Sequence, residues 1–230
     1  MIKYLILVLT FLLSINSFGQ SKGVNLGLGT YGVGFGCLPK QNGIKLNLWD
    51  KECGDVNGLN VSFNSGLRKI SGVTIGLLIA DDSIVNGIQL GTIASGAGKM
   101  NGISIGGLIA GGKVVNGLMI AGLGLAADSL NGVFISGTGS KYWNTDSISV
   151  INGVTMGIIG GAFTKRLNGI SIGLFHNVIG VQKGVTISAF NRTRELHGIQ
   201  IGLINFAGNN RKAFQWMPLI NMNLKGKASR

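Results

Sequence analysis

Residues 100–121 read MNGISIGGLIAGGKVVNGLMIA and contain one phrase twice, as MNGISIG at 100–106 and as VNGLMIA at 115–121. The phrase is a glycine, usually preceded by asparagine, then alternating aliphatic residues and a small residue. It recurs at intervals of 14 to 16 residues, with one interval of 21. This period predicts a tandem repeat of small structural units. The central glycines are Gly43, Gly58, Gly72, Gly87, Gly102, Gly117, Gly132, Gly153, Gly169, Gly184 and Gly198.

The residues around each central glycine alternate in hydrophobicity, which indicates β-strands. Counted from that glycine, positions −2, +1 and +3 are aliphatic in nearly every unit, whereas position +2 is mostly polar. Positions −2 and +1 have opposite parity along a straight strand. We therefore expect a bend at the glycine, with positive φ, that turns both aliphatic columns into one core. The alternation then places the polar +2 column on the outside.

Two architectures can use this unit, and both are all-β. In a β-solenoid, which we prefer, each unit is one coil stacked about 4.8 Å from the last, so equivalent residues form ladders. The alternative is a closed outer-membrane β-barrel with a pore or transport role, whose strands need about 9 to 11 residues each. Equal loop lengths and a terminal sequence without an aromatic residue favour the solenoid.

The first 19 residues predict export. Lys3 precedes the apolar run 4–13, and small and polar residues follow up to Gly19, as in a secretory signal peptide. We then expect an N-terminal strand or cap at 20–42, tandem β repeats at 43–206 with an insertion at 139–147, and a C-terminal cap with a basic tail at 207–230. The expected location is the outer membrane or cell surface, with the periplasm or the medium as alternatives.

The charge balance predicts acidic partners. The chain has 20 lysines and arginines against 8 acidic residues. Such a balance favours the outer membrane or an anionic polysaccharide or lipid of the envelope, whereas export and the lack of aromatics among the cations argue against nucleic acid. The oligomeric state is open. Basic residues that precede a central glycine by three or four positions predict one basic edge, formed by Arg68, Lys69, Lys99, Lys113, Lys165, Arg166 and Arg194.

Two further features are candidate sites. Cys37 and Cys53 lie 16 residues apart, in neighbouring units, and predict a disulfide in an exported chain. The interval of 21 residues holds an insertion with Tyr142 and Trp143, which predicts a recognition loop because insertions of repeat proteins often map to the binding face.

We expect no enzyme, and no catalytic, cofactor or metal site. The string GLGTYG at 27–32 spells a dinucleotide fingerprint but leads into more alternating glycine where a helix is required. Gly107 to Lys113 resembles a phosphate loop, yet Val114 replaces the hydroxyl that binds magnesium. His176 and His197 have no nucleophile or carboxylate recurring beside them. The function expected is a structural or interaction role.

Three phrases carry a resemblance to a known family. They are RELHGIQIGLIN at 194–205, LNGISIGLF at 167–175 and WMPLIN at 216–221. They resemble the bacterial surface repeat proteins of the leptospiral type over about residues 42 to 222. The resemblance implies an exported or surface-exposed repeat protein. That family is largely uncharacterised, so the resemblance supplies no active residue.

Overall fold

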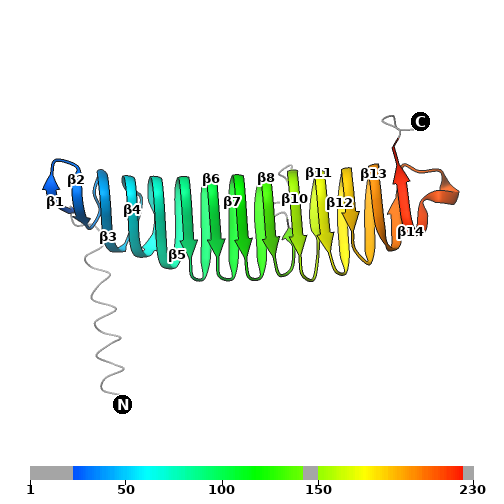
Figure 1. The fold of residues 1–230 in the computed structure, drawn as a ribbon, viewed down its shortest axis with the longest axis horizontal. Coiled ribbons are helices and arrows are strands. Elements are labelled where there is room, and N and C mark those ends of the chain that lie inside the picture. Colours follow the sequence, from blue (N-terminus) through cyan, green and yellow to red (C-terminus); the bar gives the residue numbers. More distant parts are fainter. Residues whose placement is uncertain (1–22, 142–149, 225–230) are drawn as a thin grey trace, which may run out of the picture.

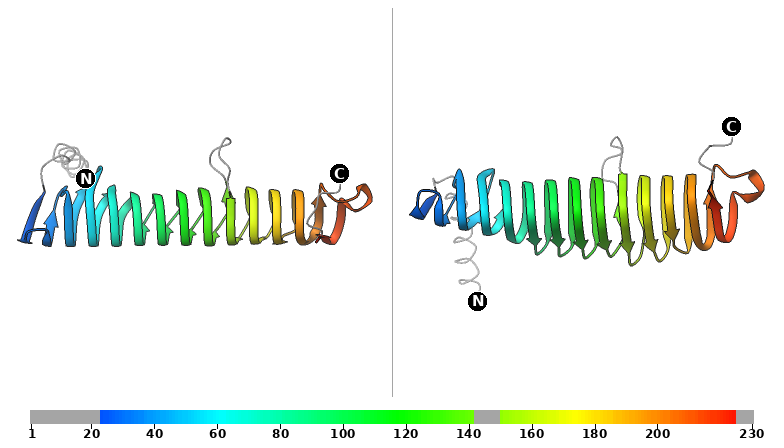
Figure 2. Two further views of the ribbon diagram at one scale, coloured as in Figure 1. Left: turned by 90° about the horizontal axis from the view of Figure 1, so that it is seen from above. Right: turned by 45° about the horizontal axis from the view of Figure 1, so that its top comes forward.

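The fold is an elongated stack of β-coils, seen from the side in Figure 1 and from two further directions in Figure 2. It was obtained as a computed structural model and describes residues 23–141 and 150–224. The stack is a β-solenoid of about 11 turns. The preferred fold class is therefore confirmed, and the description below names each coil by its central glycine.

The strands follow one another along a single sheet path. Their bounds are β1 (Val24–Leu28), β2 (Tyr31–Phe35), β3 (Lys40–Trp49), β4 (Cys53–Ser65), β5 (Leu67–Gly91), β6 (Ala94–Gly106), β7 (Ile109–Ala121), β8 (Gly124–Ser136), β9 (Ser140–Lys141), β10 (Val150–Gly157), β11 (Ala162–Gly173), β12 (His176–Ile187), β13 (Phe190–Ala207) and β14 (Trp216–Asn223), with a 3-10 turn η2 (Lys212–Phe214) before the last.

Neighbouring coils pair in parallel and in register. From β3 to β13 each central glycine lies opposite the central glycine of the next coil, as Gly102 does opposite Gly117. The pairing is antiparallel only at the two ends, between β1 and β2 and between β13 and β14. The barrel alternative is wrong, because the sheet path begins at β1 and ends at β14 instead of closing.

The phrase asparagine-glycine forms a ladder along one corner of the stack. The central glycines have φ between 120° and 154°, which confirms the predicted positive φ. From Asn86 to Asn168 an asparagine precedes every central glycine, and from Asn101 onward its Nδ2 donates to Oδ1 of the asparagine one coil back, with distances of 2.8 Å from Asn116 to Asn101 and from Asn131 to Asn116. Identical side chains stacked in register satisfy each other, which favours repetition of this residue.

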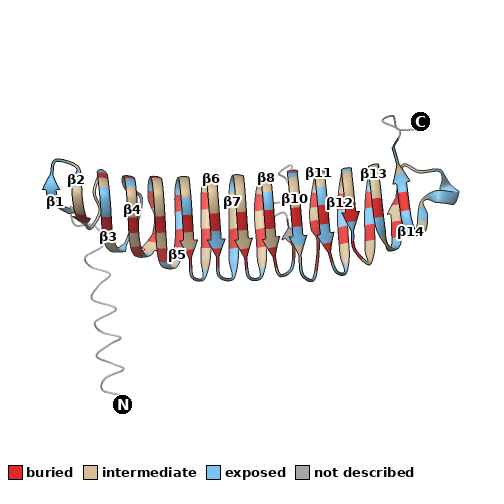
Figure 3. Cartoon of the chain, in the orientation of Figure 1, coloured by how far each residue is buried: buried red, intermediate tan, exposed pale blue. Residues whose placement is uncertain are grey.

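The interior differs from the prediction at positions +1 and +2. The aliphatic column at −2 is buried as expected, as at Val115, but the mostly polar column at +2 is also buried. The aliphatic residues at +1 and +3 point outward instead. The reason is that a glycine with φ near 130° bends the strand without changing its period of two, so −2 and +2 keep the same side. Figure 3 shows the resulting alternation.

Each coil is thin, and this lets polar residues fill its interior. Residues −4 and −3 both point outward, as do +5 and +6, and these pairs mark two edges where the chain turns. Side chains on one wall of the coil can therefore form hydrogen bonds with groups on the opposite wall. Ser95 Oγ and Ser104 Oγ lie 2.8 Å apart, and Gln89 Nε2 donates to the carbonyl of Ala80 at 3.1 Å. Buried polar groups are tolerated because they find such partners.

The core is apolar in the middle of the stack and polar toward both ends. In the middle, Met119 and Phe134 occupy the +2 column and pack with the −2 column. Toward the C-terminal end a second amide ladder runs inside the coils, where Asn177 Nδ2 donates to Asn191 Oδ1 at 3.0 Å and Asn191 Nδ2 to Asn205 Oδ1 at 2.8 Å. The N-terminal coils enclose charged residues, described below.

The structure joins Cys37 and Cys53 in a disulfide, with their Cα atoms 5.2 Å apart. The bridge links the chain after β2 to the start of β4. Within the predicted insertion at 139–147, Ser140 and Lys141 form β9 and pair with Leu125 and Ala126 of β8. Tyr142 and Trp143, the predicted recognition loop, lie outside the described residues.

Candidate binding groove

All seven residues of the predicted basic edge lie at −4 or −3, where two consecutive side chains point outward. The structure brings them to one edge of the stack but does not give them a uniform charge. Arg68 Nε donates to Asp55 Oδ1 at 2.9 Å across neighbouring coils. Lys69 and Lys99 are two coils apart, with Ile84 between them. The N-terminal part of the edge is therefore partly neutralised and interrupted.

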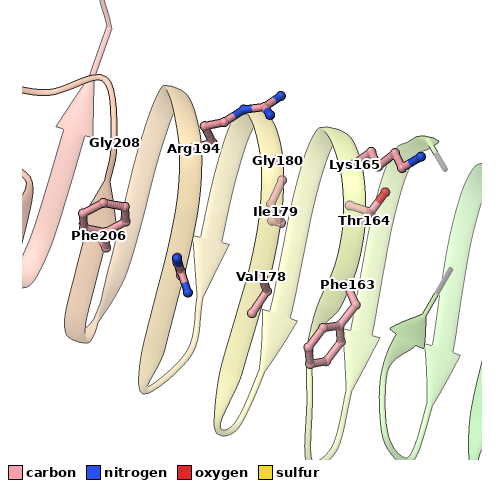
Figure 4. Close-up of a pocket in the computed structure, with 10 residues that line it drawn as sticks. Phe163, Thr164, Lys165, Val178, Ile179, Gly180, Arg194, Phe206 and Gly208 are labelled. Atoms are coloured by element: carbon pink, nitrogen blue, oxygen red, sulfur yellow. The ribbon is translucent and has the colours of Figure 1, made fainter. Parts of the chain in front are cut away.

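At the C-terminal end the same edge borders a groove of about 660 Å³ (Figure 4). The groove crosses β11, β12 and β13 on the face formed by residues at −6 and −4. Its lining residues are Phe163, Thr164, Lys165, Val178, Ile179, Gly180, Arg192, Arg194, Phe206 and Gly208. The −4 column reads lysine, glycine, arginine, glycine, so glycines without side chains leave open space between the cations.

Three cations border the groove, Lys165 and Arg194 in the −4 column and Arg192 in the −6 column. In Figure 4 Lys165 and Arg194 extend along one side, with Phe163 and Phe206 toward the other. Lys165 and Arg194 are two coils apart, a separation of roughly 10 Å at the usual strand spacing. Arg192 and Arg194 are both exposed, and within residues 23–141 and 150–224 no acidic side chain forms an ion pair with either. Arg192 and Arg194 thus bring positive charge to the groove that no ion pair of the described residues neutralises.

The other side of the groove, the −6 column, carries apolar side chains on both sides of Arg192. Phe163 packs edge-on against His176, with ring centroids 4.7 Å apart. The guanidinium of Arg192 lies 6.0 Å from the ring centre of Phe206, and Trp216 contacts the same ring at 4.7 Å. These contacts hold the aromatic rings in place and orient Arg192.

This arrangement suits the binding of an anion that carries hydrocarbon. Arginine presents planar donors that fit phosphate and carboxylate oxygens in pairs, while the apolar side accepts hydrocarbon. Sequence reasoning identified Lys165 and Arg194 but missed Arg192, Phe163 and Phe206. Those three lie in the −6 column, and reading that column in register across successive units is the signal that would have found them.

A second hollow, of about 740 Å³, lies on the same face over the middle coils. It exists because small residues occupy the −6 column there, namely Gly96, Gly111 and Ala126. Lys113 and Asp128 both border it, together with Asp81. Because charges of both signs are present, the hollow has no preference for an anion.

The N-terminal coils enclose a network of charged and polar side chains. Lys45 Nζ donates to Asp50 Oδ1, and both side chains are fully buried. Asn60 Nδ2 contacts Asp50 Oδ2 at 3.3 Å and Ser65 Oγ at 3.1 Å, and Ser65 donates in turn to Asp82 Oδ1 at 2.7 Å. The network lies inside the coils, where Lys45, Asp50 and Asp82 are all buried.

Burial shifts the pKa values of two groups in this network. It lowers the pKa of Lys45 from 10.5, although the charge of Asp50 opposes the shift. It raises the pKa of Asp82 from 3.8, against the donors Leu67 N–H and Ser65 hydroxyl. Because the folded pKa of Asp82 is raised, its contribution to stability is full at low pH and is lost as pH rises through the folded pKa.

The two histidines considered in the sequence analysis do not lie together in one site. His176 lies against Phe163, and His197 lies 4.0 Å from Glu195, several coils away from the cysteines. Among the described residues no group of three or more His, Cys, Asp or Glu is placed to hold a metal. In the same part of the chain, no helix has the length and apolar character needed to cross a membrane.

Comparison of the chain with protein-family models, with curated proteins and with solved structures gives no match. The fold nevertheless suits a structural or interaction role. It offers long ladders of equivalent residues and one groove with a distinct charge.

Proposed function

We propose that this chain is an exported repeat protein of the bacterial cell envelope, with a structural and interaction role, that binds an acidic lipid in the groove between Phe163 and Phe206. The observation that carries the proposal is the pair of exposed arginines, Arg192 and Arg194, beside an apolar side that contains Val178. The phosphate of a lipid headgroup fits the arginines, and the adjoining hydrocarbon fits the apolar side. A purely hydrophilic polysaccharide uses only half of this surface.

Export is supported by the sequence of residues 1–19 and is consistent with the Cys37–Cys53 disulfide, since such bonds form in oxidising compartments. The resemblance to leptospiral-type surface repeat proteins points to the same compartment. The protein recovered from an exporting cell should begin at Gln20. N-terminal mass spectrometry measures this directly, and an intact Met1 on all of the recovered protein would contradict export by cleavage.

Lipid binding is tested with vesicles. We expect the protein to float with vesicles that contain phosphatidylglycerol and to bind vesicles of phosphatidylcholine alone at least tenfold more weakly. The variant Arg192→Ala/Arg194→Ala should lose at least tenfold in affinity, since hydrogen bonds to charged groups are the stronger class. A matched control is Arg68→Ala/Lys69→Ala, which removes two cations from the same edge outside the groove. This control should change affinity by less than twofold.

Two competitors separate the sources of the anion. Soluble glycerol phosphate should displace the protein from vesicles only at high concentration, because it lacks the hydrocarbon that contacts Val178 and the phenylalanines. Alginate, an acidic polysaccharide, should compete no better in the wild type than in the groove variant. Equal losses in both double variants would mean that net charge alone drives binding, and preferential competition by alginate would replace the lipid with a polysaccharide.

A further inference from the structure

The side of the stack that carries positions +1 and +3 is covered by aliphatic side chains from end to end. None of these residues is buried. At +1 they are Ile44, Leu59, Val73, Ile88, Ile103, Leu118, Val133, Val154, Ile170, Val185 and Ile199; at +3 they are Leu46, Val61, Ile75, Leu90, Ile105, Ile120, Ile135, Met156, Ile172, Ile187 and Ile201. We call these two columns the aliphatic face.

The aliphatic face is regular because its coils are in register. Ile103 lies opposite Leu118, and Ile105 opposite Ile120, and the same pairing runs through the stack. Side chains of similar size therefore form straight ridges, and the uniform coils of Figure 2 keep the ridges aligned. Such ridges interdigitate when two sheets pack face to face, about 10 Å apart.

The face is larger than the apolar patches of ordinary monomers. Eleven coils at about 4.8 Å give a length of about 50 Å, and the two columns, each occupying about 6.6 Å along the strand, give a width of about 13 Å, so the face covers on the order of 650 Å². Apolar patches on ordinary monomers measure roughly 300 to 600 Å². A stable dimer needs about 800 Å² per partner. Exposed residues at the adjoining edge, such as Leu123 at 53% and Leu174 at 61%, extend the area toward that value.

From this geometry we infer that the aliphatic face is covered by a second copy of the chain in a face-to-face dimer. A twofold axis requires a patch that complements itself, and repeated aliphatic ridges do so. A lipid surface fits less well, because membrane-lying segments carry rows of cations beside their apolar face. Here the asparagine ladder forms the border. The asparagines occupy the −1 column, and among the described residues the only lysine in that column is Lys183. The basic edge, at −4 and −3, lies on the far side of this column from the aliphatic face.

The test is the mass of the purified protein in solution without detergent, measured by sedimentation at several concentrations. The wild type should sediment with twice the chain mass. The variant Ile105→Lys/Val133→Lys places charges on either side of the middle coil, at residues 36% and 39% exposed. It should weaken the dimer at least tenfold and yield monomer.

A matched control keeps the chemistry and changes only the location. Ile84→Lys/Val114→Lys alters two aliphatic residues that are each 38% exposed but lie at −3, on the basic edge. This variant should remain dimeric, and circular dichroism should show the β-sheet spectrum of the wild type for both variants. A monomeric wild type at every concentration would overturn the inference, as would equal dissociation of both variants. Flotation of the wild type with phosphatidylcholine vesicles, lost only in the face variant, would assign the face to lipid instead.

Discussion

Replacing Gly117 by valine is expected to lower the free energy of unfolding by roughly 3 to 5 kcal/mol. Gly117 has φ of 131°, a conformation that side chains rarely adopt, and this strain accounts for about 1 to 3 kcal/mol. The structure adds a second cost. A Cβ at this position would overlap the carbonyl oxygen of Gly102 in the preceding coil, which is backbone and cannot turn aside.

The position of Gly117 in the middle of the stack makes the defect visible in the shape of the transition. Each coil contacts only its neighbours, so a strained interface uncouples the two halves. Unfolding in denaturant, followed by circular dichroism, should show a lower midpoint and a broader or split transition. Hydrogen exchange should be faster in β6 and β7 than in β12.

Gly124 provides the matched control. It lies in the same region, but a Cβ there meets only Thr138 Oγ1 at 3.3 Å. Equivalent positions in other coils hold Ile79 and Ile109, so Gly124→Val should leave stability within about 1 kcal/mol of the wild type. If Gly117→Val were as neutral as Gly124→Val, the corner would not depend on glycine.

The repeat was predictable because its cause is local. The corner next to the asparagine ladder needs a glycine because its φ is positive in every coil, and the asparagine is repeated because its amide bonds to that of a neighbouring coil. Both features are visible at Asn116 and Gly117. The spacing of Cys37 and Cys53 places them in adjacent units for the same reason.

Which residues face inward could not be read from hydrophobicity. The usual assumption that apolar residues lie inside fails here, because the coil is thin enough for Ser95 and Ser104 to bond across it. Polar residues such as these two serines are then satisfied inside, and aliphatic residues such as Ile105 are left on the outside. A strand with +1 and +3 inside and a strand with +2 inside have the same period of two, so only the structure distinguishes them.

The groove could not be predicted from the sequence either, except for Lys165 and Arg194 at the basic edge. It depends on Phe163, Val178 and Arg192, which occupy the same column in three successive coils but share no residue type. The repeat is recognised from positions that keep the same residue type in successive coils. The groove is formed by positions whose residue type differs from coil to coil, so the repeat pattern does not reveal it.

Replacing Lys45 by methionine is expected to cost about 3 to 5 kcal/mol, the usual cost of removing one partner of a buried ion pair. Lys45 and Asp50 are both fully buried, so methionine leaves the carboxylate of Asp50 without a cation. Asn47 Nδ2 still donates to Asp50 at 2.6 Å, but Asp82 adds a second negative charge to the same network. Thermal unfolding at pH 7 measures the loss. The exposed Lys40, in the same strand, is the control, and Lys40→Met should change stability by less than about 0.5 kcal/mol.

Two further measurements decide whether the loss comes from charge or from packing. The double variant Lys45→Met/Asp50→Asn keeps an oxygen acceptor for Asn47 and removes the unpaired charge, so it should recover at least about 2 kcal/mol relative to Lys45→Met. The deficit of Lys45→Met should also shrink as pH falls from 8 to 5, because protonating a carboxyl group of the network, with Asp82 already raised in pKa, removes a buried negative charge. A deficit that is the same at both pH values and in both variants would instead show that the lysine acts through the volume of its side chain.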